Sequence, residues 1–377
     1  MTRPDVVVIG AGIVGAACAW FATRAGLRVT VVDRGAVAGG TTGAGEGNLL
    51  VSDKPPGPEL QLAQLSARLW SELAQEIRGF EYEPKGGLVV AATPASLDGL
   101  VALAEAQRRA GVDVRAVASD ELADYEPWLS RKLLGGAFYP QDAQVQPMLA
   151  AARLLRSARM AGAEVRLGVE VGALLRDGDR VTGVRTGTGD IAAAAVVNAA
   201  GVWGGEIAGM AGVKVPILPR RGFILVTEPL PPVVRHKVYA AEYVADVASS
   251  GAGLQTSPVV EGTPSGPVLI GSSRERVGFD RTLSVPVLRA LAAQAIELFP
   301  VLAEVVMIRA YHGFRPYCPD HLPVIGADPR APGLLHAGGH EGAGIGLAAA
   351  TGLLVAQVLS GGATDMDLSP FRPERFG

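Results

Sequence analysis

The first 33 residues of the chain alternate short apolar runs with glycine-rich turns. Val6–Ile9 is an apolar run that leads directly into glycines, and Ile13–Ala25 has the pattern of a helix. Arg28–Asp33 is a second apolar run, and it ends on an acidic residue. This order of strand, helix and strand predicts a βαβ unit at the N-terminus.

Similar patterns continue along the chain and predict a mixture of helices and strands. Apolar residues recur at helical spacing from Leu62 to Ile77, and Thr93-Pro94 is an N-cap followed by proline at the first helical position. Helices are predicted from this cap to about Arg109, at Pro147–Ala161, at Val287–Phe299, and from about Gly342 onward. Strands are predicted at Gly87–Ala92, in several runs within Val165–Val197, and at Phe223–Thr227, Val268–Ile270 and Leu334–Ala337.

The composition fits a folded protein with large cores and no basic surface. The 377 residues are 49% hydrophobic and 19% charged, and the formal net charge is −3, so we expect no nucleic-acid partner. The two cysteines, Cys18 and Cys318, are too few for a disulfide framework or for holding an iron–sulfur cluster. Cys18 is expected to be a small core residue, and a reducing cytoplasm is the expected location.

One C-terminal segment is long and apolar enough to be weighed as a membrane span. Residues 342–364 carry no charged side chain over 23 positions. The segment is nevertheless rich in glycine and alanine, and it includes Thr351, Gln357 and Ser360. Small residues favour a helix that packs closely against a sheet, so we expect no transmembrane segment.

The residues after the first strand carry a dinucleotide-binding motif. The motif has the form GxGxxG, lies between a predicted strand and a predicted helix, and reads Gly10-Ala11-Gly12-Ile13-Val14-Gly15. Its first glycine permits a tight turn, its second lets a pyrophosphate approach the backbone, and its third lets the helix lie close to the sheet. Asp33 ends the second strand at the offset expected for a partner of the ribose hydroxyls. The motif predicts a dinucleotide cofactor but does not separate FAD from NAD.

Four further motifs occur in order along the chain. Asp33-Arg34 precedes the small-residue loop Gly39-Gly40-Thr41-Thr42-Gly43, and a strand–turn–strand unit lies around Val171. The later motifs are Val196–Trp203, and Gly313–Gly326 followed by Gly339–Gly344. Together they resemble the FAD-dependent D-amino-acid oxidase superfamily, which includes glycine and sarcosine oxidases. The resemblance covers nearly the whole chain and implies FAD as the cofactor.

The resemblance also implies an α/β fold with a discontinuous cofactor domain. We expect a glutathione-reductase-like FAD-binding domain interleaved with a mostly antiparallel α+β substrate domain. The FAD-binding domain is assigned to residues 1–85, 141–215 and 320–377. The substrate domain is assigned to residues 86–140 and 216–319.

Two short stretches resemble a narrower group within this superfamily. Gly45-Glu46-Gly47-Asn48 and Gly339-His340-Glu341-Gly342 look most like the flavin subunits of D-hydroxyproline dehydrogenases, opine oxidases and hydrogen cyanide synthase. Those subunits often pass electrons to partner subunits, so electron-accepting partners are one alternative for this chain. Monomeric sarcosine oxidases attach the flavin through a cysteine. Cys318 is offset from that position, so we expect noncovalent FAD.

The residues expected to bind FAD follow from these motifs. They are Gly10, Gly12, Ile13, Val14, Gly15, Asp33, Arg34, Gly40, Thr41, Thr42, Gly47, Asn48, Val171, Ala200, Gly201, Trp203, Arg315, Gly339, His340, Glu341, Gly342, Ala343, Gly344 and Ile345. The glycines of the last stretch permit close approach to a planar ring. The helix that follows them could direct its N-terminal partial charge to flavin N1/C2=O.

Arg315, His340 and Tyr243 are the expected catalytic residues. Arg315 stands where the family places the arginine that holds a substrate carboxylate, and a planar guanidinium matches a carboxylate bidentately. The alternatives are a surface or interdomain salt bridge for Arg315, a structural hydrogen bond for His340 and core packing for Tyr243. Glu341 either contacts the cofactor or caps the helix.

Two neighbouring residues and three histidines complete the candidates. Strand alternation places only one of Tyr311 and His312 toward the pocket. His236, His321 and His336 show no metal-ligand spacing, so we expect no metal.

The expected activity is oxidation of the C–N bond of a small amino-acid-like substrate, with hydride passing from the α-carbon to flavin N5 and an imine as the product. The alternatives are a flavin subunit of a heteromeric dehydrogenase and a non-redox protein with structural FAD. The motifs at Asn198–Gly201 and Gly339–Gly346 argue against an NAD-dependent dehydrogenase.

Overall fold

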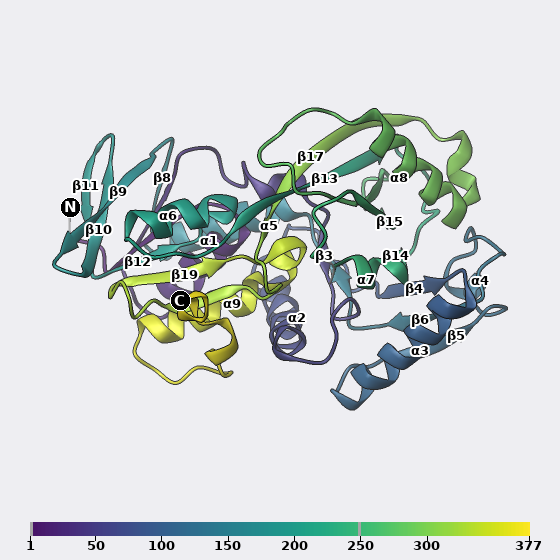
Figure 1. Cartoon of the computed structure of the whole chain (residues 1–377), viewed down its shortest axis with the longest axis horizontal. Coiled ribbons are helices and arrows are strands. Elements are labelled where there is room, and N and C mark those ends of the chain that lie inside the picture. The colour runs from purple at the N-terminus through teal and green to yellow at the C-terminus, as the bar shows by residue number, and fades with distance from the viewer. Residues whose placement is uncertain (1–2, 248–249) are drawn as a thin grey trace.

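The computed structural model of the chain describes residues 3–247 and 250–377 and contains two large β-sheets. Figure 1 shows a six-stranded sheet in one half of the molecule and an eight-stranded sheet in the other half. Helices pack on both sheets, and the expected α/β fold class is confirmed.

The six-stranded sheet is built from short apolar strands in the order β18-β19-β12-β1-β2-β8. Its neighbours are parallel except for β18, which runs antiparallel to β19. The strands are β1 (Val6–Ile9), β2 (Val29–Asp33), β8 (Glu164–Leu167), β12 (Ala195–Asn198), β18 (Val324–Ala327) and β19 (Leu334–Gly338). Every residue of β1 is buried because structure covers both faces of the sheet.

The two faces of this sheet are covered differently. Val6 and Val8 belong to the core beneath the helices α1 (Ile13–Arg24), α2 (Pro58–Glu76), α5 (Pro147–Met160) and α9 (Gly344–Leu359). Val7 and Ile9 point to the opposite face. That face packs against α6 (Gly204–Met210) and a three-stranded sheet of β9 (Val171–Asp177), β10 (Arg180–Thr186) and β11 (Gly189–Ala192).

Helix α9 is the apolar segment whose composition fits either a membrane span or a helix packed inside a folded domain. By length and composition, Glu341–Leu359 could cross a membrane, and 56% of its apolar window is buried inside this structure. The helix packs against α1 and α2. A Cβ on Gly352 would lie 2.6 Å from the carbonyl carbon of Ala17, so the two helix backbones approach very closely. The segment is closely packed, as its small residues predict, but the closest approach is to helix α1 and not to the sheet.

The eight-stranded sheet is mostly antiparallel, with the order β17-β13-β16-β15-β14-β4-β6-β5. Its strands are β4 (Gly87–Ala91), β5 (Arg115–Ala118), β6 (Gly135–Tyr139), β13 (Leu218–Thr227), β14 (Lys237–Ala240), β15 (Gln255–Gly262), β16 (Val268–Arg274) and β17 (Met307–Tyr317). Its helices are α3 (Pro94–Arg109), α4 (Leu122–Tyr125), α7 (Glu242–Val247) and α8 (Val285–Leu298). A two-stranded sheet of β3 (Asn48–Leu49) and β7 (Ala143–Gln144) completes the fold.

Strands β13 and β17 pair along their whole lengths, from Leu218 opposite Tyr317 to Thr227 opposite Met307. In Figure 1 this pair runs from the eight-stranded half toward the centre of the molecule. The sequence predicts only the apolar end of β13, at Phe223–Thr227, and for β17 it predicts strand alternation only at Tyr311 and His312. The rest of β13 was missed because Arg220, Arg221 and Gly222 interrupt the apolar pattern, although both arginines are buried in the structure.

All strands of the six-stranded sheet come from residues 1–85, 141–215 and 320–377. All strands of the eight-stranded sheet come from residues 86–140 and 216–319. On this basis we propose the same division into an FAD-binding domain and a substrate domain that the sequence suggests.

Replacing Gly352 with alanine should destabilise the protein, because the added methyl group would meet the backbone of α1 at 2.6 Å. We expect the free energy of unfolding to fall by about 1–3 kcal/mol. Gly99, in the interior of α3, has no atom within 4 Å of an added Cβ, so Gly99→Ala is the matched control. The control should gain about 0.5–1 kcal/mol. Equal Tm shifts in thermal unfolding of the two variants would refute the tight α1–α9 contact.

Candidate active site

The turn between β1 and α1 is so tight that two of its glycines cannot carry side chains. Gly10 has φ of 116°, and a Cβ there would lie 2.3 Å from the carbonyl oxygen of Ala199. A Cβ on Gly15 would lie 2.0 Å from the carbonyl oxygen of Gly10, so α1 approaches the sheet as the motif predicts. An added Cβ on Gly12 would instead point toward Thr42 Oγ1, at 3.1 Å.

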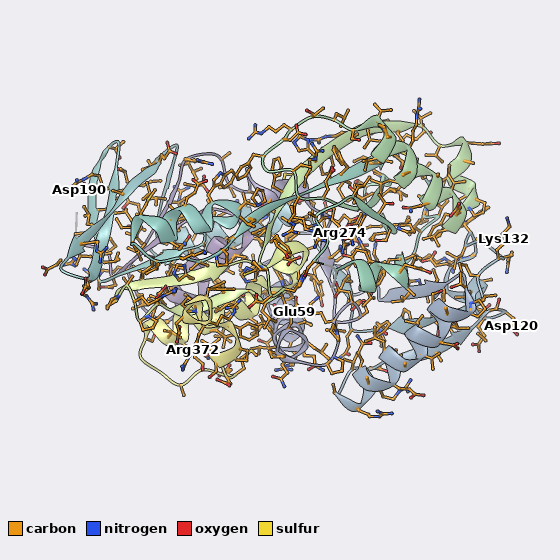
Figure 2. The ribbon with its side chains drawn as sticks, viewed as in Figure 1. Glu59, Asp120, Lys132, Asp190, Arg274 and Arg372 are labelled. Atoms are coloured by element: carbon orange, nitrogen blue, oxygen red, sulfur yellow. The ribbon has the colours of Figure 1, made fainter. Side chains whose placement is uncertain are left out.

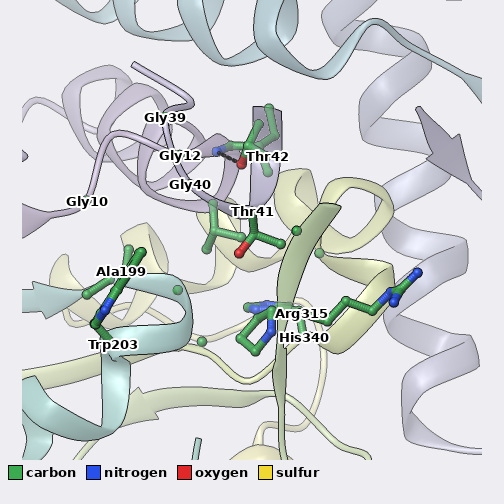
Figure 3. Close-up of a pocket in the computed structure, with 18 of the residues that line it drawn as sticks. Gly10, Gly12, Gly39, Gly40, Thr41, Thr42, Ala199, Trp203, Arg315 and His340 are labelled. Atoms are coloured by element: carbon green, nitrogen blue, oxygen red, sulfur yellow. Dashed lines mark hydrogen bonds between the residues drawn. The ribbon is translucent and has the colours of Figure 1, made fainter. Parts of the chain in front are cut away.

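The loop that follows β2 is fixed to this turn by hydrogen bonds. The Ile13 backbone N–H donates to Thr42 Oγ1 at 3.0 Å, as Figure 3 shows, and the Thr41 hydroxyl donates to the carbonyl oxygen of Phe314 at 2.6 Å. Asp33 accepts backbone N–H groups from Ala11 and Gly35, each at 2.7 Å. These bonds hold the GxGxxG turn, the end of β2 and strand β17 around one space.

That space is a cavity of about 540 Å³, and most of the predicted cofactor residues line it. They are Gly10, Gly12, Ile13, Val14, Asp33, Arg34, Gly40, Thr41, Thr42, Asn48, Val171, Ala200, Gly201, Trp203, Arg315, His340, Glu341, Gly342, Gly344 and Ile345. Gly15, Gly47 and Gly339 are not among its lining residues, and Ala343 lines an adjoining cavity instead. Gly15 contributes through the close α1–sheet contact, as its place in the motif requires.

The loop before α9 brings its backbone to one end of the cavity. Gly339 has φ of 73°, and the first turn of α9 contains no acidic residue. His340 is 3% exposed, and its Nε2 lies 3.0 Å from Thr351 Oγ1. Burial lowers the pKa of His340 to about 3, so its ring is neutral at physiological pH.

Arg315 reaches the same end of the cavity from β17. Its Nη1 donates to the carbonyl oxygen of Ser273 at 2.7 Å, and its Nη2 donates to Ser272 Oγ at 3.1 Å. An added Cβ on Gly222, on the neighbouring strand β13, would lie 2.1 Å from Nη1, so this glycine leaves room for the guanidinium. Within residues 3–247 and 250–377, Arg315 forms no ion pair, so the salt-bridge alternative has no partner there.

Neither Tyr311 nor His312 lines the cavity, so the expectation that one of them faces it is wrong. Tyr311 alternates in phase with Gly313 and Arg315, which do line the cavity, but it lies one step further along β17. His312 points to the other side, where its ring lies 5.9 Å from that of Phe223. Strand alternation predicts the face of a residue but not how far along the strand the cavity extends.

Tyr243 stands where the first cavity meets a second one of about 730 Å³, and it lines both. It is 7% exposed, its ring lies 5.1 Å from that of Tyr239, and the guanidinium of Arg274 lies 4.9 Å from its ring centre. Arg315, His340, Glu341 and Gly342 also line both cavities. Core packing and a place in the site are therefore compatible roles for Tyr243.

Glu341 forms an ion pair with Arg220 rather than capping α9. One carboxylate oxygen lies 3.4 Å from Arg220 Nη1, and the other lies 3.0 Å from His321 Nδ1. The N-cap of α9 is Ala343, and no side chain caps that helix end. The capping alternative for Glu341 is therefore wrong, because its side chain points to the adjoining arginine.

Several residues at the site are missing from the sequence-based set, and buried charges dominate among them. Glu46 lines the first cavity, accepts from Asn48 Nδ2 at 3.1 Å and lies 3.8 Å from Lys237 Nζ. Burial raises the pKa of Glu46. Arg220 and Arg274 line the second cavity. The sequence signal that could have identified such residues is a charged side chain close to an apolar run. Arg274, shortly after the run Val268–Ile270, is an example.

The first cavity fits FAD by the chemistry of its walls. Glycines form much of its lining, so backbone rather than side chains faces the space. The N-termini of α1 and α9 both open onto it, and neither has an acidic residue in its first turn. Such ends favour phosphate and a negatively charged ring. Gly10 to Val14 and Asp33 would hold the adenosine diphosphate part, and the loop from His340 to Ile345 would hold the ring.

Two further groups bear on cofactor chemistry. Cys318 is fully buried and is not among the lining residues of either cavity, and burial raises the pKa of its thiol to about 12. A covalent flavin link through this thiol therefore has no support here. In the described part of the chain, no group of three His, Cys, Asp or Glu residues could hold a metal ion.

Comparison with known proteins identifies the same cofactor chemistry. The sequence model of the DAO family, described as FAD dependent oxidoreductase, matches residues 5–358. Glycine oxidase from Geobacillus kaustophilus is 30% identical over 377 residues, covering 98% of this chain and 96% of that protein. Its crystal structure aligns with a TM-score of 0.89 and 29% identity over 99% of both chains.

Two other relatives extend the comparison. Hydrogen cyanide synthase subunit HcnC from Pseudomonas aeruginosa is 29% identical over 416 aligned positions, covering 99% of this chain and 96% of that protein. Iminodiacetate oxidase from Chelativorans sp. BNC1 aligns with a TM-score of 0.84 and 26% identity over 98% of both chains. The expected fold and family resemblance are confirmed.

We predict that the purified protein contains one FAD per chain, released by denaturation, and that Gly12→Val abolishes this binding. A branched side chain at Gly12 would occupy the place of the pyrophosphate, and affinity should fall on the order of 100-fold or more. FAD absorbance per chain and equilibrium dialysis of the apoprotein measure this. Gly187→Val is the control, because an added Cβ there meets no atom within 4 Å. A folded Gly12→Val protein with full FAD would contradict the assignment.

Proposed function

Because the chain belongs to the DAO family of FAD-dependent oxidoreductases, we propose that it oxidises the C–N bond of an amino acid or secondary amino acid. Bound FAD supplies the hydride acceptor, flavin N5, for the hydrogen on the substrate α-carbon. The observation that carries the proposal is Arg315, whose guanidinium has no ion pair among the described residues and lies at the end of the cavity near the His340–Ile345 loop.

Arg315 would orient the substrate through its carboxylate. Its Nη1 and Nη2 are fixed by Ser273 and Ser272, and Pro316 restricts its backbone to an extended form. An added Cβ on Gly342 would lie 3.5 Å from Arg315 Nε, so the guanidinium lies directly beside the ring-binding loop. A carboxylate held there fixes the α-carbon relative to that loop, and such orientation is a large part of catalysis.

His340 supports the loop rather than moving a proton. Its neutral ring is buried, and its Nε2 lies within hydrogen-bond distance of Thr351 on α9. This arrangement favours the structural alternative and makes His340 a positioning residue. No strong base is required if the substrate amine loses its proton on binding, because the amine's lone pair then assists departure of the α-hydrogen as hydride. The product imine would hydrolyse after release.

A second candidate function is a flavin subunit that passes electrons to partner subunits. It is supported by the likeness to HcnC, which is a hydrogen cyanide synthase subunit, over 99% of this chain. Cys18 and Cys318 are both buried, so an iron–sulfur relay would have to come from another chain. The two reduced cysteines also fit the cytoplasmic location that we propose.

We predict that Arg315→Ala lowers kcat/KM for carboxylated substrates about 10- to 100-fold or more, because a charged hydrogen-bonded pair is lost. FAD content and fold should remain. Arg315→Lys should also be impaired, since a point charge cannot replace the planar fork. Arg315→Ala should lose most discrimination between an amino acid and its decarboxylated amine, such as sarcosine and dimethylamine.

Arg309→Ala is the matched control, because Arg309 lies on the same strand but is exposed and stacks on Tyr311. Its kinetics should match those of the parent. If Arg315→Ala oxidises carboxylated substrates as efficiently as the parent, Arg315 is structural and the carboxylate assignment is wrong.

We predict faster turnover with an artificial dye acceptor than with oxygen, on the basis of the likeness to HcnC. The measurement compares steady-state rates with both acceptors at one substrate concentration. Faster turnover with oxygen would identify a stand-alone oxidase and exclude the partner-dependent alternative.

A further inference from the structure

Arg274 ends strand β16 and lines the second cavity, and Figure 2 shows it near the middle of the molecule. It is 4% exposed and stacks on the ring of Tyr243. Its hydrogen bond to the protein is a long one, 3.4 Å from Nη2 to Ser272 Oγ. Over residues 3–247 and 250–377, Arg274 forms no ion pair.

Arg315 and Arg274 share this lack of a counter-ion. Ser272 Oγ lies 3.1 Å from Arg315 Nη2 and 3.4 Å from Arg274 Nη2, so one hydroxyl stands between two guanidinium groups. Burial, and then repulsion from Arg274, lower the pKa of Arg315 to about 10, which leaves it charged at neutral pH. A buried and a half-buried guanidinium that lie close together, with no ion pair in the described chain, are costly unless an anion completes the site.

The acidic residues nearby are engaged elsewhere. Glu341 pairs with Arg220 at 3.4 Å, and Asp53 pairs with Lys54 at 2.5 Å. Glu46 lies 3.8 Å from Lys237.

Two further acids, Glu59 and Glu242, line the second cavity, but neither forms an ion pair with Arg274 or Arg315 in the described chain. No side chain described at the site therefore forms an ion pair with either arginine. The charge of Glu46 acts on Arg315 from a distance, but Glu46 also lies 3.8 Å from Lys237.

We propose, building on the proposed function, that the substrate is an amino acid with two carboxylates, one held by Arg315 and the other by Arg274. The chemical class comprises dicarboxylic amino acids and iminodiacids. The second carboxylate would stand on the side chain in the former and on the nitrogen substituent in the latter.

The positions of the two arginines favour two carboxylates over one. Arg315 lines both cavities, whereas Arg274 lines the second cavity and not the first. A substrate whose α-carbon lies beside the ring-binding loop would extend its far end into the second cavity. A single carboxylate would neutralise one guanidinium and leave the other buried without a counter-ion.

The test compares matched substrates that differ in the second carboxylate. Sarcosine and iminodiacetate differ at the nitrogen substituent, and norvaline and glutamate differ at the side-chain end, each amino acid in both D and L forms. The holoenzyme should prefer the dicarboxylate of at least one pair by about 10-fold or more in kcat/KM. The pair that shows the preference identifies where the second carboxylate lies.

Arg274→Gln should remove this preference. The dicarboxylate should lose about 10- to 100-fold in kcat/KM, while its monocarboxylate partner changes less than about 3-fold. Arg276→Gln is the control for a loss of positive charge nearby, because Arg276 stacks on Tyr317 and lines neither cavity. Arg276→Gln should leave kcat/KM unchanged for both the dicarboxylate and its monocarboxylate partner.

Three results would overturn the proposal. One is a parent enzyme without preference for either dicarboxylate. Another is an equal loss of kcat/KM in Arg274→Gln for the dicarboxylate and for its monocarboxylate partner. That result would mean that both arginines hold a single carboxylate. The third is the same loss of preference in Arg276→Gln.

A binding measurement separates this proposal from the proposed function. Glutarate and butyrate are titrated into the holoenzyme, and the change in FAD absorbance gives the two dissociation constants. Glutarate should bind at least about 10-fold more tightly, and Arg274→Gln should abolish the difference. If no amino acid is oxidised but glutarate keeps this advantage, the oxidase function fails while the two-carboxylate site stands. Equal binding of glutarate and butyrate would reject the site even in an active enzyme.

Discussion

The paired strands β13 and β17 are the feature on which the site depends. Their continuous pairing, from Leu218 opposite Tyr317 to Thr227 opposite Met307, carries residues of the eight-stranded sheet to the cavity beside the six-stranded sheet. The same register sets Arg220 opposite Arg315. Like charges opposite each other destabilise a strand pair, so this register needs compensation. Glu341 supplies it for Arg220, whereas Arg315 forms no ion pair in the described chain, which is why we propose it as the carboxylate-binding residue.

Local motifs predicted most of the residues that line the first cavity because much of that lining is glycine backbone. The GxGxxG turn requires glycines at Gly10 and Gly15 for steric reasons that hold in any βαβ unit, and the distances to Ala199 and Gly10 show this directly. The resemblance to a family added the loop at Thr41 and Thr42 and the stretch before α9. These segments meet around one cavity, as their order along the chain implied.

The half of the molecule that contains the eight-stranded sheet was less predictable, because its charged residues contact residues that are distant in the sequence. Glu46 and Lys237 come together from separate domains of the proposed division, and Arg274 meets Tyr243 across two elements. A charged residue in an apolar run indicates a buried charge. The apolar pattern does not show which distant residue pairs with that charge. The strand alternation used for Tyr311 and His312 failed for a related reason, because it gives the face of a strand and not the extent of the cavity.

The central claim is that an amino acid held by Arg315 delivers its α-hydrogen to bound FAD. Anaerobic mixing of the holoenzyme with a panel of substrates tests it most directly, since no electron acceptor or partner subunit is then needed. The panel would contain glycine, sarcosine, D- and L-proline, D- and L-glutamate, hydroxyprolines, iminodiacetate and opines. At least one of them should bleach the absorbance band of the oxidised flavin in a single turnover. A fully loaded flavin that no member of the panel bleaches would contradict it.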